Sequence, residues 1–191
     1  MIPKMTQNYE TLPENLPIPE DDGACEHLVG MSLPEFDLPS TGGDLINLSK
    51  LKGKVVIYCY PMTGKPGVPL PEGWDQIPGA RGCTPQSCSF RDHYAELQSL
   101  GAGVFGLSTQ DTEYQKEMTE RLHLPFKVLS DSSLFFSKSL HLPTFEVEGK
   151  TLIKRVTIIS NEGVIEAVHY PVFPSHSDAS WVIDVLQNEV S

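Results

Sequence analysis

Positive charge is scarce in this sequence. It holds 14 lysines and arginines against 25 aspartates and glutamates, for a formal net charge of −11. This excess of acids argues against nucleic acid and anionic membranes as partners, because both attract basic surfaces. The four arginines are Arg81, Arg91, Arg121 and Arg155. In so acidic a chain, each is a candidate for a specific local role.

Long apolar stretches and a basic leader are also lacking. The longest apolar runs fall far short of a membrane span, and residues 1–22 show no basic region followed by an apolar core. We therefore expect neither a membrane segment nor a signal peptide. The four cysteines, Cys25, Cys59, Cys83 and Cys88, are too few for a disulfide scaffold. We expect a cytoplasmic setting, where a disulfide is catalytic more often than structural.

The length and the local composition predict one domain with an extension. Residues 1–30 carry three prolines between positions 13 and 19 and a cluster of acids, which cannot form a core by themselves. We expect this acidic extension to be disordered or laid over the domain. The domain itself is predicted to span residues 31–191, a length that buries a large core.

Strand and helix patterns alternate along the domain. We predict strands at 54–60, 103–108 and 126–130, helices at 85–100, 112–123 and 132–141, hairpins at 34–48 and 152–172, and a closing helix at 175–190. This order predicts an α/β protein with a thioredoxin-like fold: a mixed central sheet flanked by helices, with an N-terminal β-hairpin. Residues 62–80 form a long loop, and loops of that length are often functional.

The run at 82–92 (GCTPQSCSFRD) places two cysteines five residues apart. Cys83 falls at the predicted start of a helix, where free N–H groups and the helix dipole lower the pKa of a thiol. On a regular helix Cys83 and Cys88 have Cα atoms roughly 8–9 Å apart, whereas a disulfide needs about 4.4–6.8 Å. The spacing therefore predicts a folded dithiol form and a locally unwound disulfide form. It favours a cysteine that first meets a peroxide, becomes a sulfenic acid and then condenses with the second thiol.

The same run resembles the peroxiredoxins of the Q (bacterioferritin comigratory protein) group. That motif has a peroxidatic cysteine followed by Thr, a resolving cysteine five residues on, and then Arg-Asp. Three further blocks resemble the group in the same order: Tyr60-Pro61, the segment 124–131 (LPFKVLSD), and the segment 155–160 (RVTIIS) with Gly163 and Ile165. The similarity runs from about Met31 to the C-terminus.

The resemblance implies a thiol-dependent peroxidase that reduces hydrogen peroxide and organic hydroperoxides. Cys83 would be the peroxidatic cysteine and Cys88 the resolving one. Arg155 would stabilise the thiolate and the peroxide, and Pro61 would shield the pocket. No metal, haem or flavin is implied. A thioredoxin- or glutaredoxin-like dithiol would reduce the disulfide, and we expect a monomer or a dimer.

One departure from the family concerns the peroxide pocket. The group places a Thr three residues before the peroxidatic cysteine, and here that position is Ala80, after a longer loop. Thr63, Thr84 or a backbone N–H would have to fill the slot, and we favour Thr63. Arg81 is an added cation next to Cys83.

The other residues and functions have plainer interpretations. Cys59 is expected to be a small core residue, and Arg91 to anchor its helix by pairing. Cys25 is open between a free surface thiol, an alternative resolving cysteine and a pairing site. Two other functions remain: a thiol–disulfide oxidoreductase without a peroxide step, and a binding module with vestigial cysteines.

Overall fold

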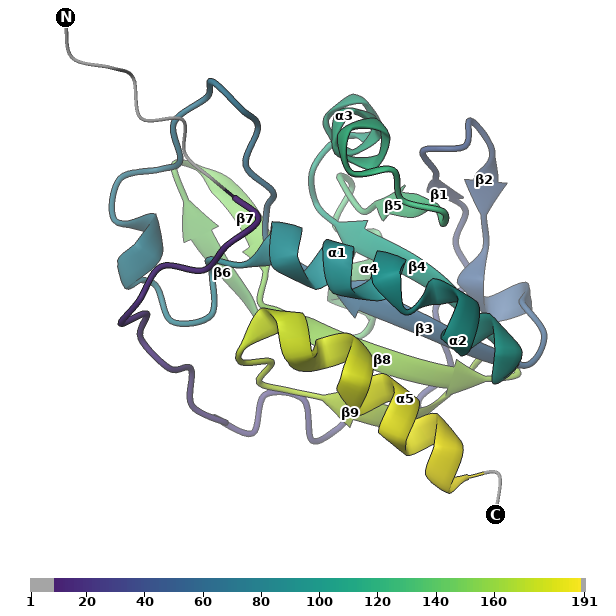
Figure 1. Ribbon diagram of the computed structural model, residues 1–191. Helices are drawn as coiled ribbons and strands as arrows, with labels where there is room; N and C mark the ends of the chain where they lie inside the picture. The colour runs from purple at the N-terminus through teal and green to yellow at the C-terminus, as the bar shows by residue number, and fades with distance from the viewer. Residues whose placement is uncertain (1–8, 190–191) are drawn as a thin grey trace, which may run out of the picture.

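A five-stranded sheet forms the centre of the computed structural model, which describes residues 9–189 (Figure 1). The strand order is β5–β4–β3–β8–β9. The bounds are β3 (Lys54–Cys59), β4 (Ala102–Ser108), β5 (Val128–Ser130), β8 (Val156–Asn161) and β9 (Val164–His169). β3, β4 and β5 run parallel, whereas β8 pairs antiparallel with β3 and β9 with β8. The predicted mixed sheet and thioredoxin-like fold are thus confirmed.

Side chains of β3 alternate between two cores, as the pleat requires. Val56 and Tyr58 pack into a cluster with helices on one face, α1 (Cys83–Asp92), α2 (Tyr94–Ser99), α3 (Thr112–Leu122) and α5 (Asp178–Asn188). Val55, Ile57 and Cys59 pack on the other face, with α4 (Phe135–Ser139) and N-terminal residues. Figure 1 shows α1, α2 and α5 lying across the same face of the sheet. Among residues 9–189, no helix has the length and apolar character needed to cross a membrane.

The N-terminal hairpin agrees with the sequence prediction, whereas two of the predicted helices differ from it in detail. The expected N-terminal hairpin is present as β1 (Leu38–Pro39) paired with β2 (Leu45–Ile46). The single helix expected at 85–100 is instead α1 and α2, separated at His93, whose backbone leaves the helical region. The expected closing helix is α5, preceded by a 3₁₀ turn at 175–177; Val190 lies outside the described residues.

A second hairpin was missed by the sequence patterns. β6 (Thr144–Val147) pairs antiparallel with β7 (Lys150–Ile153) through a turn at Glu148 and Gly149, both with positive φ. The first strand of the hairpin expected at 152–172 is therefore two strands, β7 and β8. The chain leaves β7 and enters β8 at Lys154 and Arg155. This break places Arg155 just before β8, at the end of the sheet where β3 ends.

Replacing Phe90 by Ala tests how firmly α1 is held to the sheet. Phe90 is fully buried and stacks on Tyr58 with ring centroids 4.5 Å apart and an interplanar angle of 9°. We expect Phe90→Ala to lower the free energy of unfolding in urea by about 3–5 kcal/mol, from lost burial and a cavity. Phe135→Ala is the control, because Phe135 is 45% exposed, and should cost about 1 kcal/mol. Equal losses would contradict this account of α1 packing.

Candidate active site

Cys83 is the first residue of α1 and lies beneath the surface. Its side chain is 3% exposed, and Gly82 precedes it as the N-cap residue. The helix therefore directs its free N–H groups and the positive end of its dipole towards the residue that the sequence singled out. All four cysteines are free thiols in this structure.

Arg155 holds the sulfur of Cys83. It is 4% exposed, and its Nη2 donates to Cys83 Sγ at 3.2 Å. Nη2 also donates to the Ala80 carbonyl at 3.0 Å, and Nε donates to the Gly79 carbonyl at 3.3 Å. The guanidinium is thus fixed by the loop that leads into α1. The structure brings Cys83 and Arg155 together, although 72 residues separate them in the chain.

Two buried polar residues behind Arg155 were missed by the sequence analysis. Arg155 Nη1 donates to Gln86 Oε1, and Gln86 Nε2 donates to Asp178 Oδ2 at 2.7 Å. Both Gln86 and Asp178 are fully buried. Gln86 sits inside the cysteine motif, so its uncharged polar side chain was visible there. Asp178 gave no signal, because an acid at the start of a helix is an ordinary feature.

Cys88 lies on the same helix as Cys83 and is half-buried. Burial raises the pKa of its thiol; the nearby Arg91 guanidinium acts in the opposite direction, and Glu10 adds to the rise. With both cysteines inside α1, their Cα atoms stand roughly 8 Å apart by helix geometry. The two thiols are therefore in the folded dithiol arrangement that the spacing predicts.

The remaining cysteines belong to the core. Cys59 is fully buried in β3, and burial raises its pKa well above the ordinary value, as suits the small core residue that was expected. Cys25 is 6% exposed and packs in the same cluster. Burial, followed by Asp22 and Asp21, raises the pKa of Cys25 to about 12. Cys25 is therefore a buried thiol rather than a surface one, and it is a poor nucleophile.

The residues considered for the peroxide pocket have different surroundings. Pro61 is buried and lines a cavity together with Arg155. Thr63 is 1% exposed, and its hydroxyl donates to Gln110 Oε1 at 3.2 Å. Thr84 is buried and lines the same small cavity as Cys83. At Ala80 it is the backbone that takes part, since its carbonyl accepts from both Arg155 and the Cys83 thiol. Peroxide contact by Pro61 or Thr63 stays a prediction.

Two other arginines pair with neighbouring groups. Arg81 donates to Asp75 at 3.0 Å and lies 5.6 Å from the centre of the Tyr9 ring. Its charge is therefore partly balanced by Asp75. Arg91 pairs with Asp92 at 3.0 Å and donates to the Leu122 carbonyl at 2.9 Å. Arg91 thus anchors α1 to the end of α3, as expected.

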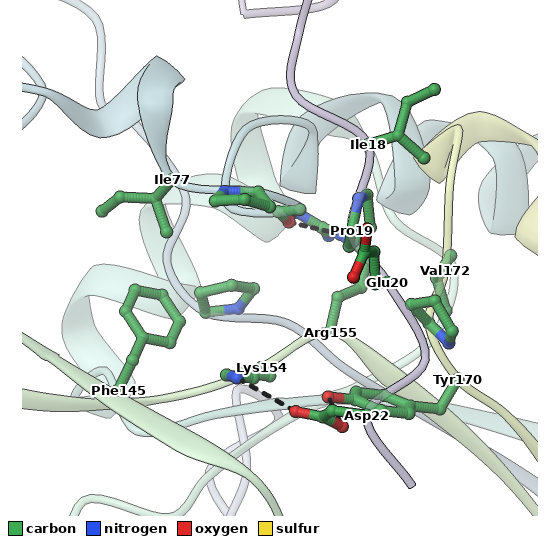
Figure 2. A pocket seen from close by; sticks show the side chains of 14 residues that line it. Ile18, Pro19, Glu20, Asp22, Ile77, Phe145, Lys154, Arg155, Tyr170 and Val172 are labelled. Atoms are coloured by element: carbon green, nitrogen blue, oxygen red, sulfur yellow. Dashed lines mark hydrogen bonds and ion pairs between the residues drawn. The ribbon is translucent and has the colours of Figure 1, made fainter. Parts of the chain in front are cut away.

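Two cavities flank the Cys83–Arg155 pair. A small one of about 10 Å³, roughly the space of one water molecule, is lined by Cys83, Thr84, Trp74 and Tyr9. A larger one of about 560 Å³ contains Arg155 and Pro61. Figure 2 shows Ile77 and Phe145 on one side of it and Pro19 and Val172 on the other. The larger cavity offers a mostly apolar approach to Arg155.

The N-terminal segment at 9–22 lies over the loop at 62–82. The Tyr9 hydroxyl donates to the Val68 carbonyl at 3.0 Å, and a Cβ added at Gly64 would meet the Tyr9 ring. Asp22 accepts from the Tyr170 hydroxyl at 2.9 Å and pairs with Lys154 at 3.6 Å, as Figure 2 shows. This part of the predicted extension is thus laid over the domain, whereas residues 1–8 lie outside the described residues. The boundary at residue 30 stays a prediction.

Within residues 9–189, no group of three or more His, Cys, Asp and Glu side chains is arranged to hold a metal ion. The features that the described site does offer are a thiol at a helix start, a buried arginine on its sulfur, and a second thiol one turn further on. On a thioredoxin-like fold, these features define a thiol-based redox protein.

Known families and proteins support this class. The Redoxin family model matches residues 28–183. Peroxiredoxin Q from Sedum lineare, named chloroplastic, is 31% identical over 160 residues, which cover 83% of this chain and 77% of that protein. The putative peroxiredoxin bcp of Coxiella burnetii is 30% identical over 145 residues, which cover 73% and 86%. The chain spans 66% of the length of the peroxiredoxin Q of rice, at 30% identity over 160 residues and 83% of this chain.

Solved structures agree on the fold. The peroxidoxin BcpB of Mycobacterium tuberculosis superposes with a TM-score of 0.69 at 24% identity, covering 85% of this chain and 98% of that one. A bacterioferritin comigratory protein of Xanthomonas campestris gives a TM-score of 0.66 at 20% identity, covering 84% and 98%. The chain belongs to the redoxin family and, within it, to the peroxiredoxin Q (bcp) group.

Replacing Gly82 by Ala tests the backbone that presents Cys83. Gly82 has φ +120°, and an added Cβ would overlap Ser175 Oγ and approach Leu12 Cδ2 at 3.1 Å. Gly43 is the matched control, with φ +85° and nothing within 4 Å. We expect Gly43→Ala to cost about 1–2 kcal/mol of unfolding free energy from backbone strain, and Gly82→Ala to cost more. Equal losses of unfolding free energy in the two variants would show that the contacts around Gly82 do not contribute to stability.

Proposed function

We propose that the protein is a thiol-dependent peroxidase that reduces hydrogen peroxide and organic hydroperoxides through Cys83. The observation that carries the proposal is Arg155 Nη2 at 3.2 Å from Cys83 Sγ, at the start of α1. Membership of the peroxiredoxin Q group supports it. The related protein of Xanthomonas campestris is described by its alkyl peroxide reduction activity.

The first step is oxidation of Cys83. Its thiolate attacks one peroxide oxygen, the O–O bond breaks, and the other oxygen leaves with its electron pair and takes a proton to become water or an alcohol. Cys83 becomes a sulfenic acid. Arg155 donates to the sulfur before the attack, and its N–H groups stabilise the charge that develops on the oxygens. Pro61 and Thr63 are assigned to the peroxide side of the pocket.

The second step joins the two cysteines. The Cys88 thiolate attacks the Cys83 sulfur, the S–S bond forms, and the hydroxyl leaves as water after taking a proton. Because both residues are on α1, its first turn must unwind for the sulfurs to meet. A thioredoxin- or glutaredoxin-like dithiol then reduces the disulfide by exchange. The cytoplasmic location and the monomeric or dimeric state of the protein stay predictions. Several plant relatives are named chloroplastic.

Serine substitutions at the cysteines test the assignment. In stopped-flow mixing with peroxide, we expect Cys83→Ser to lose consumption, because serine cannot form a sulfenic acid. Cys88→Ser should consume one equivalent and accumulate a sulfenic acid that dimedone traps at Cys83. Cys59→Ser is the control and should react like wild type. Peroxide consumption by Cys83→Ser at the wild-type rate would contradict the proposal. The alternative, a disulfide oxidoreductase without a peroxide step, predicts no trapped sulfenic acid in Cys88→Ser.

The resolving step should accelerate as pH rises from 7 to 9. Burial raises the pKa of Cys88 above its unfolded value. The thiol form therefore stabilises folded α1 below the unfolded pKa, and this stabilisation is lost as pH rises through the range up to the folded pKa. Higher pH also supplies more of the attacking thiolate. We expect the rate of disulfide formation, followed by quenched mass spectrometry, to increase with pH. A flat or falling profile would contradict the role of Cys88.

A further inference from the structure

We propose that Asp178, acting through Gln86, is a positioning residue that sets the orientation of Arg155 towards Cys83. The inference rests on the proposed function, which it deepens. Four buried side chains form a continuous line from the sulfur inwards: Arg155 Nη2 donates to Cys83, Arg155 Nη1 donates to Gln86, and Gln86 donates to Asp178. Asp178 is the inner end of this line, with Arg155 and Gln86 between it and Cys83.

The amide of Gln86 is held in one orientation by its two neighbours. A guanidinium has only donors, and an ionised carboxylate has only acceptors. Gln86 Oε1 must therefore face Arg155 and Nε2 must face Asp178, as the structure shows. Without the carboxylate, the amide is free to turn its NH₂ group towards the guanidinium, where donor faces donor. Asp178 thus controls which end of Gln86 meets Arg155.

Asp178 is itself fixed from two further elements. The Thr157 hydroxyl, from β8, donates to the same Oδ2 as Gln86. His169 Nδ1, from the end of β9, lies 2.8 Å from Oδ1, and its ring stacks on Trp181 with centroids 4.4 Å apart. A carboxylate anchored by α1, β8 and β9 at once moves little, which a positioning residue requires.

The charges around the buried Arg155 guanidinium also support a role for Asp178. The hydrogen bonds that fix the Arg155 guanidinium go to neutral acceptors, the Gly79 and Ala80 carbonyls and the Gln86 amide. A buried cation needs compensating charge nearby. Asp178 supplies a carboxylate one side chain away, and Cys83 supplies a second anion when it ionises.

An exchange of the carboxylate and the amide tests the proposal. Asp178→Asn loses control of the Gln86 amide, and Gln86→Glu sets two carboxylates against each other. We expect each single variant to react with hydrogen peroxide at Cys83 about 10-fold more slowly, the loss of one charge-assisted hydrogen bond. In the double variant, the carboxylate introduced on α1 accepts both from Arg155 and from the amide introduced on α5, so the rate should return to within about 3-fold of wild type. Asp184→Asn, at an exposed position of α5, is the control and should leave the rate unchanged.

A second measurement separates positioning from stability. We expect the pH of half-maximal iodoacetamide alkylation of Cys83 to shift upwards in each single variant and to return in the double variant. Loss of the Asp178 charge by itself would lower the midpoint, so an upward shift in Asp178→Asn reports the lost contact between Arg155 and Cys83. A purely structural role for Asp178 would lower the melting temperature and leave this midpoint in place. Single variants that fold and react at the wild-type rate would overturn the proposal. So would a folded double variant that stays 10-fold slow, even if the single variants fail to fold.

The same data separate this proposal from the proposed function. If wild-type protein consumes no peroxide, the peroxidase assignment fails. The alkylation midpoints of Cys83 still report whether Asp178 positions Arg155, because they need no peroxide. If wild type consumes peroxide and the midpoints do not move among the variants, the peroxidase assignment stands and the positioning role fails.

Discussion

The contact between Arg155 and the sulfur of Cys83 is the constraint around which the site is built. It joins the start of α1 to the break between β7 and β8, with both side chains almost fully buried. A buried guanidinium demands acceptors on every side. The loop at 79–80 provides carbonyls, α1 provides Gln86, and Gln86 is met by Asp178 from α5. The start of α1, the loop at 79–80 and the chain entering β8 therefore all meet at the Arg155 guanidinium.

The sequence predicted those parts of the molecule that leave a local pattern. The apolar run of β3 and the helix start at Cys83 were predicted within a residue or two. Periodicity failed where an element was interrupted briefly, at His93 between α1 and α2 and at Lys154 and Arg155 between β7 and β8. A single residue outside the helical region does not disturb the spacing of apolar residues enough to be seen.

The site was predicted only as far as its residues carry recognisable chemistry. Cys83, Cys88 and Arg155 were singled out as candidates because a motif and a resemblance mark them. The Gly79 and Ala80 carbonyls were not, because backbone acceptors have no letter in the sequence. Asp178 was not, because it meets Gln86 across 92 residues of chain and no local pattern encodes that contact. Ala80 is an example. In the sequence its side chain indicates only that the family's Thr hydroxyl is absent, whereas in the structure its backbone carbonyl accepts hydrogen bonds from Arg155 and Cys83.

The proposed disulfide between Cys83 and Cys88 would also involve the N-terminal segment. The two thiols lie too far apart on α1 to bond while the helix is intact. Unwinding moves Gly82, which stands against Ser175 and Leu12, and it disturbs the small cavity that Tyr9 helps to line. The acidic segment at 9–22 is thus packed on the part of the chain that the proposed disulfide would require to move. The stability of the dithiol form depends on these contacts as well as on the hydrogen bonds within α1.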